Sequence, residues 1–501
     1  MSKRKKILSG ITIDFVGSII VTIVGFVVVP FYFNYITNEE FGLWVAIAGI
    51  SAMITMVDLG TDQYLTTLTA SDEKFYAPNY GDYLTSLLLI KTIVSFLFGL
   101  IGVIMYLFLT KLLDIELMYL DEAKISFLIG IVILVLSGYF STISTILYAR
   151  HHYSLINSFI AISAISTSLG TVGLLHFGFG IVSFPLAQLT TIIVQHIILF
   201  VYMLKNYPHI RLKIKNFHFI DKKEIIGYTT TFQILRWVHT LRTQYITIAI
   251  NNLVGPLYVA QYNLTNKMPQ MVPSYALKIV NPFFPIIADL FYKGKIKEIQ
   301  EVFIKISKVL FRIGLFFGIV IYFLNGSFVT LWVGKDKFAG STIILFLAIY
   351  MFVYVAFGAF GIVVYASRKF EKWTTWSIVE IILSVFFSYL FSFSYGLLGI
   401  VLGFLLGSMV TQFYLFGMVL RQLNLSKLFF LNLTLTYSIS SNFLPLLFGV
   451  FILYFINVNS WIAFTIVGSG FVLFGFTIDF IKIYNSKEVG IKNKIYKVFM
   501  P

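Results

Sequence analysis

The sequence of residues 86–109 is SLLLIKTIVSFLFGLIGVIMYLFL, a continuous apolar stretch that contains one charged residue, Lys91. About 20 such residues form an α-helix that crosses the hydrocarbon core of a bilayer. A strand of a membrane barrel would instead alternate apolar and polar residues, and this stretch does not. Residues 86–109 are therefore predicted to form a transmembrane helix with a lysine inside it.

The composition of the whole chain agrees with this prediction. Of the 501 residues, 58% are hydrophobic and 12% are charged, whereas a soluble globular chain carries about 25% charged residues. A water-exposed surface could not accommodate 53 Phe and 30 Tyr. The chain has 0 Cys, which excludes disulfides, thiolate nucleophiles and cysteine metal sites. These values exclude a soluble enzyme and a disordered or fibrous chain.

Fourteen apolar stretches are long enough to span a bilayer, so the predicted fold class is an all-α polytopic membrane protein. Residues 1–6 are basic, but the first stretch is too long for a signal peptide, and we expect it to remain as a permanent helix. The predicted spans are 10–33, 41–60, 86–109, 125–148, 155–175, 181–204, 225–250, 256–283, 306–324, 341–366, 375–393, 397–419, 437–457 and 461–481.

The basic residues predict the orientation of these spans. With the N-terminus inside, 25 Lys and Arg lie in inner segments and 4 lie in outer loops. Because lysine and arginine concentrate on the cytoplasmic side of membrane proteins, both termini are predicted to be cytoplasmic. The net charge of +15 then faces anionic lipid, and it does not require a nucleic acid partner. The basic segment 205–223 is interpreted as an inner loop and not as an RNA-binding patch.

Segment 205–224 is the only plausible linker, and it separates two sets of six spans. The predicted domains are an N-terminal bundle at 1–204, a cytoplasmic linker at 205–224, a C-terminal bundle at 225–420 and an addition at 421–501, which holds two further helices and a basic tail. Since six is even, the two bundles would form a parallel repeat. The outer turns that open spans two and eight support this repeat, because each places a small residue, Gly42 or Ala260, two positions before an aromatic residue.

The sequence contains no Walker-type phosphate loop and no dinucleotide-binding glycine pattern, so we expect neither ATP hydrolysis nor a bound cofactor. The seven His are scattered, and the one adjacent pair, His151 and His152, has no carboxylate at metal-ligand spacing. We therefore predict no metal site.

Span seven carries polar residues that lipid would not tolerate. Arg236, His239 and Arg242 fall within an arc of about 120° on a helix with 100° per residue. An ionised group at the bilayer centre costs at least about 2.5 kcal/mol, so this arc is predicted to face the protein interior. Gln233 lies one turn before Arg236 on the same span.

Span eight carries a longer polar stripe, interrupted by Pro269 and Pro273. Because each proline removes a backbone donor, we expect a bend or local unwinding there. Irregular backbone at membrane depth is tolerated where it is buried or lines a water-filled cavity, so the stripe is predicted to line one. Its helically spaced members are Asn263, Asn266, Lys267, Gln270, Ser274 and Lys278.

Other charged residues lie in or beside the remaining spans. Lys91 in span three and Arg312 in span nine are predicted near the cytoplasmic side, while Asp14 and Glu380 are carboxylates within spans. Asp58, Asp62 and Asp479 are interpreted as solvated helix ends. An alternative for Arg236, Arg242 and Lys267 is internal pairing with Asp14 or Glu380. Because intramembrane cations exceed carboxylates, we expect a surplus of positive charge that binds an anionic substrate.

Four segments resemble the bacterial O-antigen and polysaccharide-repeat-unit flippases of the multidrug/oligosaccharidyl-lipid/polysaccharide exporter superfamily. They are NEEFGLW at 38–44, GPLYVAQY at 255–262, PFFP at 282–285 and LWVG at 331–334. The resemblance covers nearly the whole chain through loose, family-level motifs. It implies a V-shaped pair of six-helix bundles around a central cavity. It also implies translocation of an undecaprenyl-diphosphate-linked oligosaccharide to the outer leaflet of the cytoplasmic (inner) membrane.

On this interpretation the chain is a transporter and not an enzyme. Asp14 and Glu380 are candidates for ion or proton coupling, together with His239. A polysaccharide polymerase and a chain-length regulator are the protein partners considered. The predicted substrate-binding residues are, for phosphate, Arg236, Arg242 and Lys267, with Lys91, Arg312 and Lys278 as further cations, and, for sugar hydroxyls, Gln233, His239, Asn263, Asn266 and Gln270.

Two alternatives stay open. An ion-coupled multidrug exporter would share the fold, and it would use a dominant carboxylate in its cavity. A membrane-embedded polysaccharide polymerase or glycosyltransferase would have a similar number of spans, but it would usually need a large outer loop. The longest outer loops here are 110–124 and 325–340, which makes the polymerase the weaker alternative.

Overall fold

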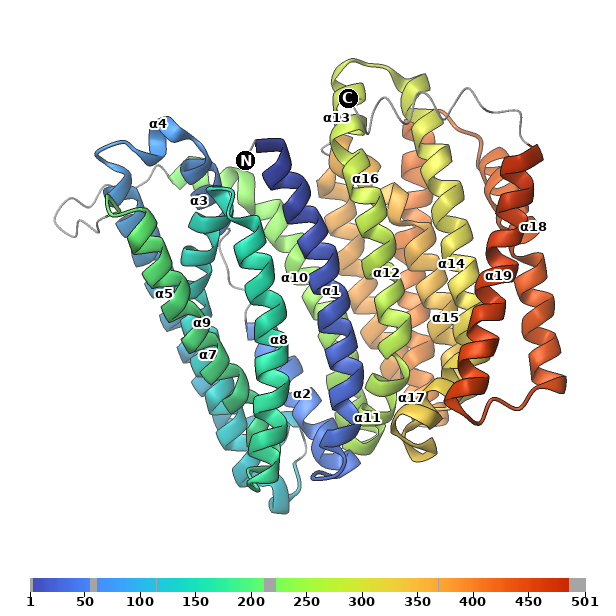
Figure 1. The fold of residues 1–501 in the computed structure, drawn as a ribbon, viewed down its shortest axis with the longest axis horizontal. Coiled ribbons are helices and arrows are strands. Elements are labelled where there is room, and N and C mark those ends of the chain that lie inside the picture. Colours follow the sequence, from blue (N-terminus) through green and yellow to red (C-terminus); the bar gives the residue numbers. More distant parts are fainter. Residues whose placement is uncertain (1–2, 55–60, 114, 211–221, 368, 486–501) are drawn as a thin grey trace. The chain divides into compact units, whose positions relative to one another are not determined.

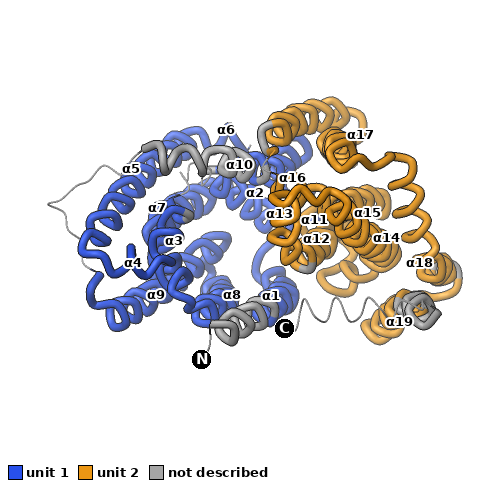
Figure 2. The backbone as a smooth tube through the Cα atoms, turned by 90° about the horizontal axis from the view of Figure 1, so that it is seen from above, with its two compact units in different colours: residues 1–261 blue, residues 262–501 orange. Residues whose placement is uncertain are grey.

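The computed structural model describes residues 3–54, 61–113, 115–210, 222–367 and 369–485, and every regular element in this part of the chain is a helix (Figure 1). The side chains of residues 3–15 and 222–236 also lie outside the described part. The chain divides into two compact units, unit 1 at residues 1–261 and unit 2 at residues 262–501 (Figure 2). Each unit is described by itself.

Unit 1 holds the N-terminal helices, and α7 lies at its centre. Helix α7 packs against α2, α3, α5 and α9, while α1 packs against α8. The helices are α1 (Lys3–Tyr32), α2 (Asn38–Ile54), α3 (Thr61–Ala70), α4 (Asp72–Phe75), α5 (Tyr80–Leu107), α6 (Leu109–Leu113), η2 (Leu117–Tyr119), α7 (Leu120–Ala149), α8 (Tyr153–His176), η3 (Gly180–Val182), α9 (Ser183–Asn206) and α10 (Lys222–Leu253).

Local sequence explains where α2 begins. The backbone N–H of Thr37 donates to Glu40 Oε2 at 2.7 Å, and the N–H of Glu40 donates to Thr37 Oγ1 at 3.2 Å. This reciprocal capping box satisfies two amide donors that a helix start would otherwise leave unpaired. The turn that the sequence places before span two is therefore a stable helix start.

Two hydrophobic clusters fill unit 1, one toward each end of α5 and α7. The first is centred on Ile47, Phe98 and Phe127, and the second on Phe75 and Leu147. All five side chains are buried. The middle of α5, where Lys91 lies, falls between the two clusters.

Helix α10 packs against α2 in unit 1. Two asparagines near its C-terminal end bind the end of α6. Asn251 Nδ2 donates to the carbonyl of Leu113 at 2.5 Å, and Asn252 Nδ2 donates to the carbonyl of Leu112 at 2.6 Å. The division into compact units therefore comes after α10. The domain boundaries predicted around segment 205–224 stay a prediction.

Unit 2 is built around the long helix α14, which packs against α12, α13, α15, α16, α18 and α19. Aromatic rings fill its core: Phe303 lies 5.0 Å from Phe360 and 5.4 Å from Phe430 between ring centroids. The helices are α11 (Pro256–Thr265), which runs across the division between the units, α12 (Lys267–Val280), η4 (Asn281–Phe283), α13 (Phe284–Tyr292), α14 (Ile296–Val333), η5 (Lys335–Lys337), α15 (Ser341–Ala356), α16 (Gly358–Ser367), α17 (Phe370–Gln422), α18 (Lys427–Phe455) and α19 (Trp461–Asn485).

Helix α17 is a hairpin of two antiparallel helices. The chain turns at Gly396, whose φ of 54° and ψ of −128° are open to glycine but strained for other residues. Gly399, Gly403 and Gly407 then recur every four residues, and their backbones touch the chain at 384–392. Small residues at this spacing let two helix backbones approach closely inside a membrane. Spans eleven and twelve of the sequence analysis correspond to the two arms of this hairpin.

The two C-terminal helices pack against α14 and against each other. Glycines admit aromatic rings at these contacts: Gly449 on α18 lies against Phe323, and Gly475 on α19 lies against Phe316. Phe471 is fully buried in the hydrophobic cluster that joins α14, α18 and α19. The described part of the predicted addition, residues 421–485, thus packs on α14 within unit 2.

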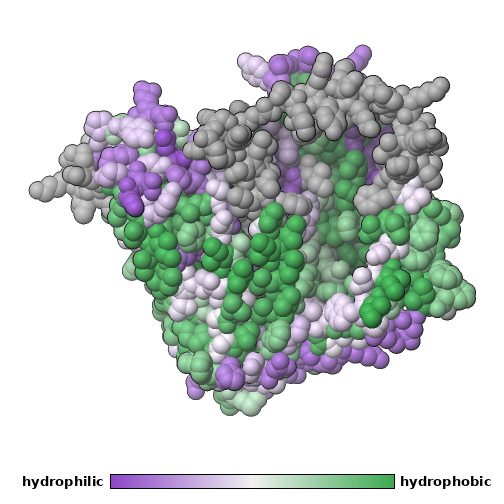
Figure 3. Space-filling view, in the orientation of Figure 1, coloured by the Kyte–Doolittle hydropathy of each residue, from purple (hydrophilic) through white to green (hydrophobic). Residues whose placement is uncertain are grey.

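Within the described residues, nine helices are long and apolar enough to cross a membrane. One of them, Lys372–Gln422, contains the hairpin, and the shorter apolar helices Val16–Tyr32 and Trp461–Gly475 lie at predicted spans one and fourteen. Helices α2 and α10 lie at predicted spans two and seven but are not among the nine. Hydrophobic residues cover the middle of the helices in Figure 3, and hydrophilic ones collect at their ends. The chain is a multi-pass membrane protein.

Candidate functional site

Lys91 on α5 is buried in unit 1 and surrounded by oxygen atoms. Its Nζ lies 2.5 Å from Asp62 Oδ1 on α3, 2.8 Å from Ser141 Oγ, 2.8 Å from Thr142 Oγ1 and 3.0 Å from the Gly138 carbonyl, the last three on α7. Only 6% of the lysine side chain is exposed. The ammonium therefore joins three helices.

This arrangement changes the interpretation of both charged partners. Asp62 was expected to be a solvated helix end, but 29% of its side chain is exposed and its carboxylate forms an ion pair. A buried ammonium is stable here because a carboxylate and three further acceptors replace its hydration. Lys91 is thus neutralised within unit 1, and its predicted role as a substrate-binding cation stays a prediction.

Helix α10 carries the predicted residues Gln233, Arg236, His239 and Arg242. The side chains of the first three lie outside the described residues. Arg242 is described and is 8% exposed. Close by, the carboxamide of Gln244 faces Gly49 on α2, so this part of α10 is directed toward its neighbour in unit 1. A buried Arg242 agrees with the prediction that the polar arc avoids lipid.

The polar stripe of span eight lies on α11 and α12. Asn263, Lys267 and Lys278 are half-buried, whereas Gln270 is exposed. Asn266 is 7% exposed, and its Nδ2 donates to Tyr262 Oη at 3.1 Å. The structure therefore places these predicted residues along one pair of consecutive helices.

Lys267 differs from the other described cations of this stripe. In the part of the chain that the structure describes, its ammonium has no hydrogen-bond or ion-pair partner. Lys267 is the eleventh residue after Pro256, which puts it about 16 Å along the helix at about 1.5 Å per residue. Measured from Pro256, where predicted span eight begins, that distance is about half of a hydrocarbon core about 30 Å thick. A half-buried cation at that depth needs an anion, and the described residues do not supply one.

The expected irregularity in span eight is present. Helix α11 ends at Thr265 and α12 begins at Lys267, with Asn266 between them. Pro269 removes the N–H that would bond to the carbonyl of Thr265. Asn325 on α14 replaces that donor, since its Nδ2 lies 2.9 Å from the Thr265 oxygen. Sequence reasoning predicted an irregularity here but missed Asn325, because nothing in the sequence places α14 beside α11.

Arg312 on α14 is directed to the C-terminal helices. Its Nη2 donates to the carbonyl of Gly475 on α19 at 3.0 Å. Asn442 on α18 donates from Nδ2 to the Arg312 carbonyl at 3.2 Å and to the Ser438 carbonyl at 2.9 Å. Arg312 therefore ties α14 to α18 and α19, and its predicted contact with substrate stays a prediction.

The two candidate coupling carboxylates differ in what the structure describes. Glu380, on the first arm of the α17 hairpin, is 2% exposed. The side chain of Asp14 on α1 lies outside the described residues, as do Asp58 and the side chain of Asp479. Glu380 is thus a buried carboxylate of unit 2.

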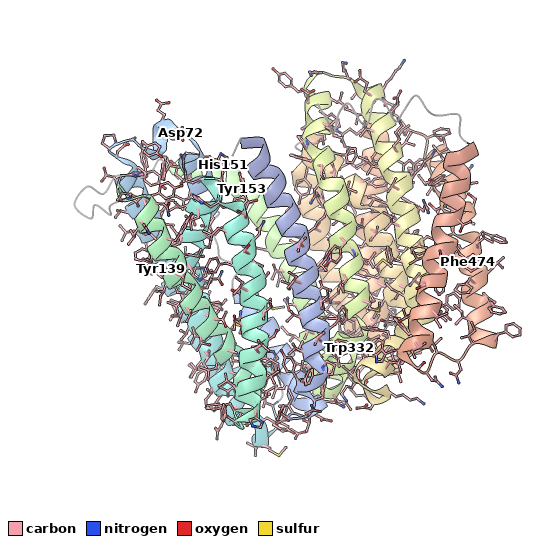
Figure 4. The ribbon with its side chains drawn as sticks, in the orientation of Figure 1. Asp72, Tyr139, His151, Tyr153, Trp332 and Phe474 are labelled. Atoms are coloured by element: carbon pink, nitrogen blue, oxygen red, sulfur yellow. The ribbon has the colours of Figure 1, made fainter. Side chains whose placement is uncertain are left out.

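A cluster of charged and aromatic side chains lies at one end of unit 1, around Arg150 at the C-terminal end of α7. It was not predicted from the sequence. Its Nη1 lies 2.6 Å from Asp72 Oδ1 on α4, and its guanidinium carbon lies 4.5 Å from the ring centroid of Phe75 and 5.5 Å from that of Tyr76. Asp72 lies at this end in Figure 4, near His151. An arginine stacked on aromatic faces and paired with a carboxylate joins the α3–α5 connection to α7.

The end of α9 completes this cluster. The ring of His209 lies 4.9 Å from Phe75, and His152 Nε2 lies 2.8 Å from Tyr207 Oη. Burial lowers the pKa of Arg150, but the hydrogen bond and charge of Asp72 outweigh it and raise the pKa overall. The pKa of His209 is lowered, first by burial and then by the charge of Arg150. The guanidinium of Arg150 therefore stays charged, and the lowered pKa of His209 favours its neutral imidazole.

The chain is similar to known proteins in its sequence family and in its fold. The model of a family described as polysaccharide biosynthesis protein matches residues 7–291. The fold is similar to that of the lipid II flippase MurJ in its inward closed conformation, with a TM-score of 0.69 and 13% identity over 94% of this chain and 99% of that one. A search of curated protein sequences found no match.

The fold is also similar to that of exporters. An inward-facing multidrug resistance MATE family transporter of the MOP superfamily matches with a TM-score of 0.66 and 13% identity, over 81% of this chain and 94% of that one. A variant of the MATE transporter VcmN of Vibrio cholerae matches with a TM-score of 0.58 and 15% identity, over 84% and 97%. At these identities the likeness establishes the fold, which is the fold of MOP-superfamily transporters.

Proposed function

The chain belongs to the polysaccharide biosynthesis protein family, and from this premise we propose that it flips a lipid-linked oligosaccharide across the membrane. The substrate in this proposal is an undecaprenyl-diphosphate-linked repeat unit, which moves from the cytoplasmic to the outer leaflet for O-antigen, capsule or another surface polysaccharide. The sugar and diphosphate headgroup enters the protein while the polyprenyl tail stays in lipid.

One observation carries this proposal: Lys267 is half-buried and has no hydrogen-bond or ion-pair partner among the described residues, and it lies in the middle of predicted span eight. An unpaired cation at the bilayer centre costs at least about 2.5 kcal/mol. A passing diphosphate would offset that cost, because its oxygens accept charge-assisted hydrogen bonds from an ammonium. A site that is satisfied only when the headgroup is present is what a flippase needs to lower the barrier to crossing.

The residues around Lys267 suit the rest of the headgroup. Asn263 and Gln270 offer carboxamides on the same stripe, and amides form hydrogen bonds with sugar hydroxyls. In this proposal Arg236 and Arg242 on α10 also bind phosphate. The other predicted residues keep the roles given in the sequence analysis. The headgroup is also contacted by Gln233, His239, Asn266 and Lys278. Lys91 and Arg312 act nearer the entrance, and Asp14 or Glu380 binds a coupling ion.

The same proposal includes the finer topology. Fourteen spans form two six-helix bundles with two additional C-terminal helices, both termini are cytoplasmic, and the protein lies in the bacterial cytoplasmic membrane. The asymmetry of lysine and arginine between inner and outer segments supports this orientation. A polysaccharide polymerase and a chain-length regulator are the proposed protein partners, since they act on the flipped repeat unit.

The alternative function is ion-coupled multidrug export. It is favoured by the fold shared with MATE transporters and by the buried carboxylate Glu380. A drug exporter for cationic compounds would depend on that carboxylate and would gain nothing from an unpaired lysine. Deletion of the gene distinguishes the two functions: drug susceptibility changes if the chain exports drugs, and surface polysaccharide is lost if it flips a repeat unit.

The decisive experiment replaces Lys267 by glutamine and by arginine. K267Q removes the charge at similar size, and since charge-assisted hydrogen bonds contribute about 1.5–3 kcal/mol we expect restoration of surface polysaccharide to fall at least about tenfold. K267R keeps the charge and should retain most of the activity. The readout is surface polysaccharide in a deletion strain, normalised to the amount of protein in the membrane.

Lys111 provides the matched control, because it is an exposed lysine beyond the membrane-spanning part of α5. K111Q should restore polysaccharide as well as the native protein does. Full activity of K267Q at normal protein level would refute the anion site. Loss of activity in both K267Q and K267R would also count against it, because charge would then not be the property that matters.

A further inference from the structure

The break between α11 and α12 leaves one backbone carbonyl without its helical donor. In a continuous helix the N–H of residue 269 would bond to the carbonyl of Thr265, but residue 269 is a proline. Thr265 is 0% exposed, so water does not reach this group from the surface. A buried carbonyl without a partner is strongly unfavourable in an apolar environment.

Two other segments of unit 2 supply hydrogen-bond donors to Thr265, one to its carbonyl and one to its hydroxyl. Asn325 on α14 donates from Nδ2 to the Thr265 carbonyl at 2.9 Å. The backbone N–H of Ala339, in the loop before α15, donates to Thr265 Oγ1 at 2.9 Å. Asn325 is also 0% exposed, and a buried carboxamide would be unfavourable without this bond.

We propose that Asn325 is a positioning residue for transport: by donating to the Thr265 carbonyl it holds the break between α11 and α12 in place. The break sets the rotation of α12 about its axis relative to α11, and hence the direction in which Lys267 and Gln270 face. This inference rests on the proposed function, because in it Asn325 orients the polar stripe of α11 and α12 that binds the substrate. Asn325 itself does not touch the substrate.

The bond between Asn325 and Thr265 makes a specific prediction about Pro269. P269A restores the N–H at position 269, and the Thr265 carbonyl can then be satisfied within the helix. N325L removes the donor at similar volume. If Asn325 acts through the Thr265 carbonyl, N325L must be more harmful when Pro269 is present than when it is replaced.

The test is a double-mutant cycle in the purified full-length protein, with melting temperature and transport both measured. N325L should lower the melting temperature by about 2–4 °C, and the same change in P269A should lower it clearly less. If N325L alone does not accumulate, recovery of folded protein in P269A/N325L gives the same support. Restored surface polysaccharide in the deletion strain is the measure of transport.

Transport separates a positioning role from one that is only structural. The double variant regains stability through a straight helix, which turns Lys267 away from its native direction, so its transport should stay low although its melting temperature recovers. Stability that is rescued together with full transport would overturn the positioning role. An equal loss of melting temperature from N325L with and without Pro269 would overturn the link to the Thr265 carbonyl.

Asn442 is the matched control. It is a 2% exposed asparagine of the same unit that also donates to backbone carbonyls, those of Arg312 and Ser438. N442L should lower the melting temperature equally with and without Pro269. The thermal cycle does not depend on what is transported, so the Asn325–Pro269 coupling can hold even if the K267Q experiment refutes the anion site.

Discussion

Lys91 illustrates how a charged side chain becomes acceptable inside a membrane protein. Its ammonium touches a carboxylate, two hydroxyls and a carbonyl, and these come from α3 and α7 while the lysine comes from α5. The pair lies between two hydrophobic clusters of unit 1. Replacing one partner leaves an uncompensated charge, whereas replacing both removes the problem.

We therefore expect K91M to destabilise unit 1 by leaving Asp62 and the hydroxyls without their donor. The loss should be about 2–3 kcal/mol, below the about 3–5 kcal/mol of a fully buried pair, because the Asp62 side chain is 29% exposed. The double variant D62L/K91M should recover part of the loss. Thermal unfolding of the purified protein measures K91M, D62L and the double variant, and additive effects of D62L and K91M would contradict a direct ion pair.

The α17 hairpin shows how glycine spacing sets the distance between two helices. A Cβ added at Gly403 would lie 2.1 Å from the backbone nitrogen of Ser388, and one added at Gly407 would lie 2.1 Å from Ser384 Oγ. Ser388 Oγ donates to the carbonyl of Ile400 at 2.9 Å, which is possible because the arms are so close. The first arm of the hairpin also carries the buried candidate coupling residue Glu380.

G403A should separate the two arms, because backbone atoms cannot move aside as a flexible side chain can. We expect a loss of more than about 3 kcal/mol in the free energy of unfolding, beyond ordinary overpacking. G417A on the same arm is the control, since its Cβ would meet only Arg421 Nη2 at 3.7 Å, an ordinary contact. Equal melting temperatures for the two variants would show that the arms are not in close contact at Gly403.

The two outer turns that open predicted spans two and eight lie against each other. Gly42 at the start of α2 and Ala260 on α11, the small residues matched between the two turns, lie beside each other in unit 1. A Cβ added at Gly42 would lie 1.8 Å from the carbonyl oxygen of Pro256 and 3.3 Å from the nitrogen of Ala260. The contact between the two turns thus explains the glycine at position 42, and the internal repeat itself stays a prediction.

G42A should disrupt this contact and abolish transport, because α11 leads directly into the polar stripe of α12. G25A on α1 is the control, as nothing lies within 4 Å of a Cβ added there. An alanine within a helix is more stable than glycine by about 0.5–1 kcal/mol, so G25A should keep or raise the melting temperature. Normal polysaccharide synthesis by G42A would contradict a close contact of the two turns.

The helical membrane class, most of the helix positions and the hairpin arms follow from hydropathy alone, because a bilayer demands long apolar helices whatever their partners. The irregularity in span eight was predictable too, since a proline removes a backbone donor wherever it lies. The partners of the buried polar groups could not be predicted from the sequence. Lys91 meets Asp62, Arg312 meets Gly475 and Asn325 meets Thr265 only because helices distant in sequence pack together. Hydrogen bonds act over about 3 Å, so which intramembrane cations are neutralised and which are left for a ligand depends on tertiary packing.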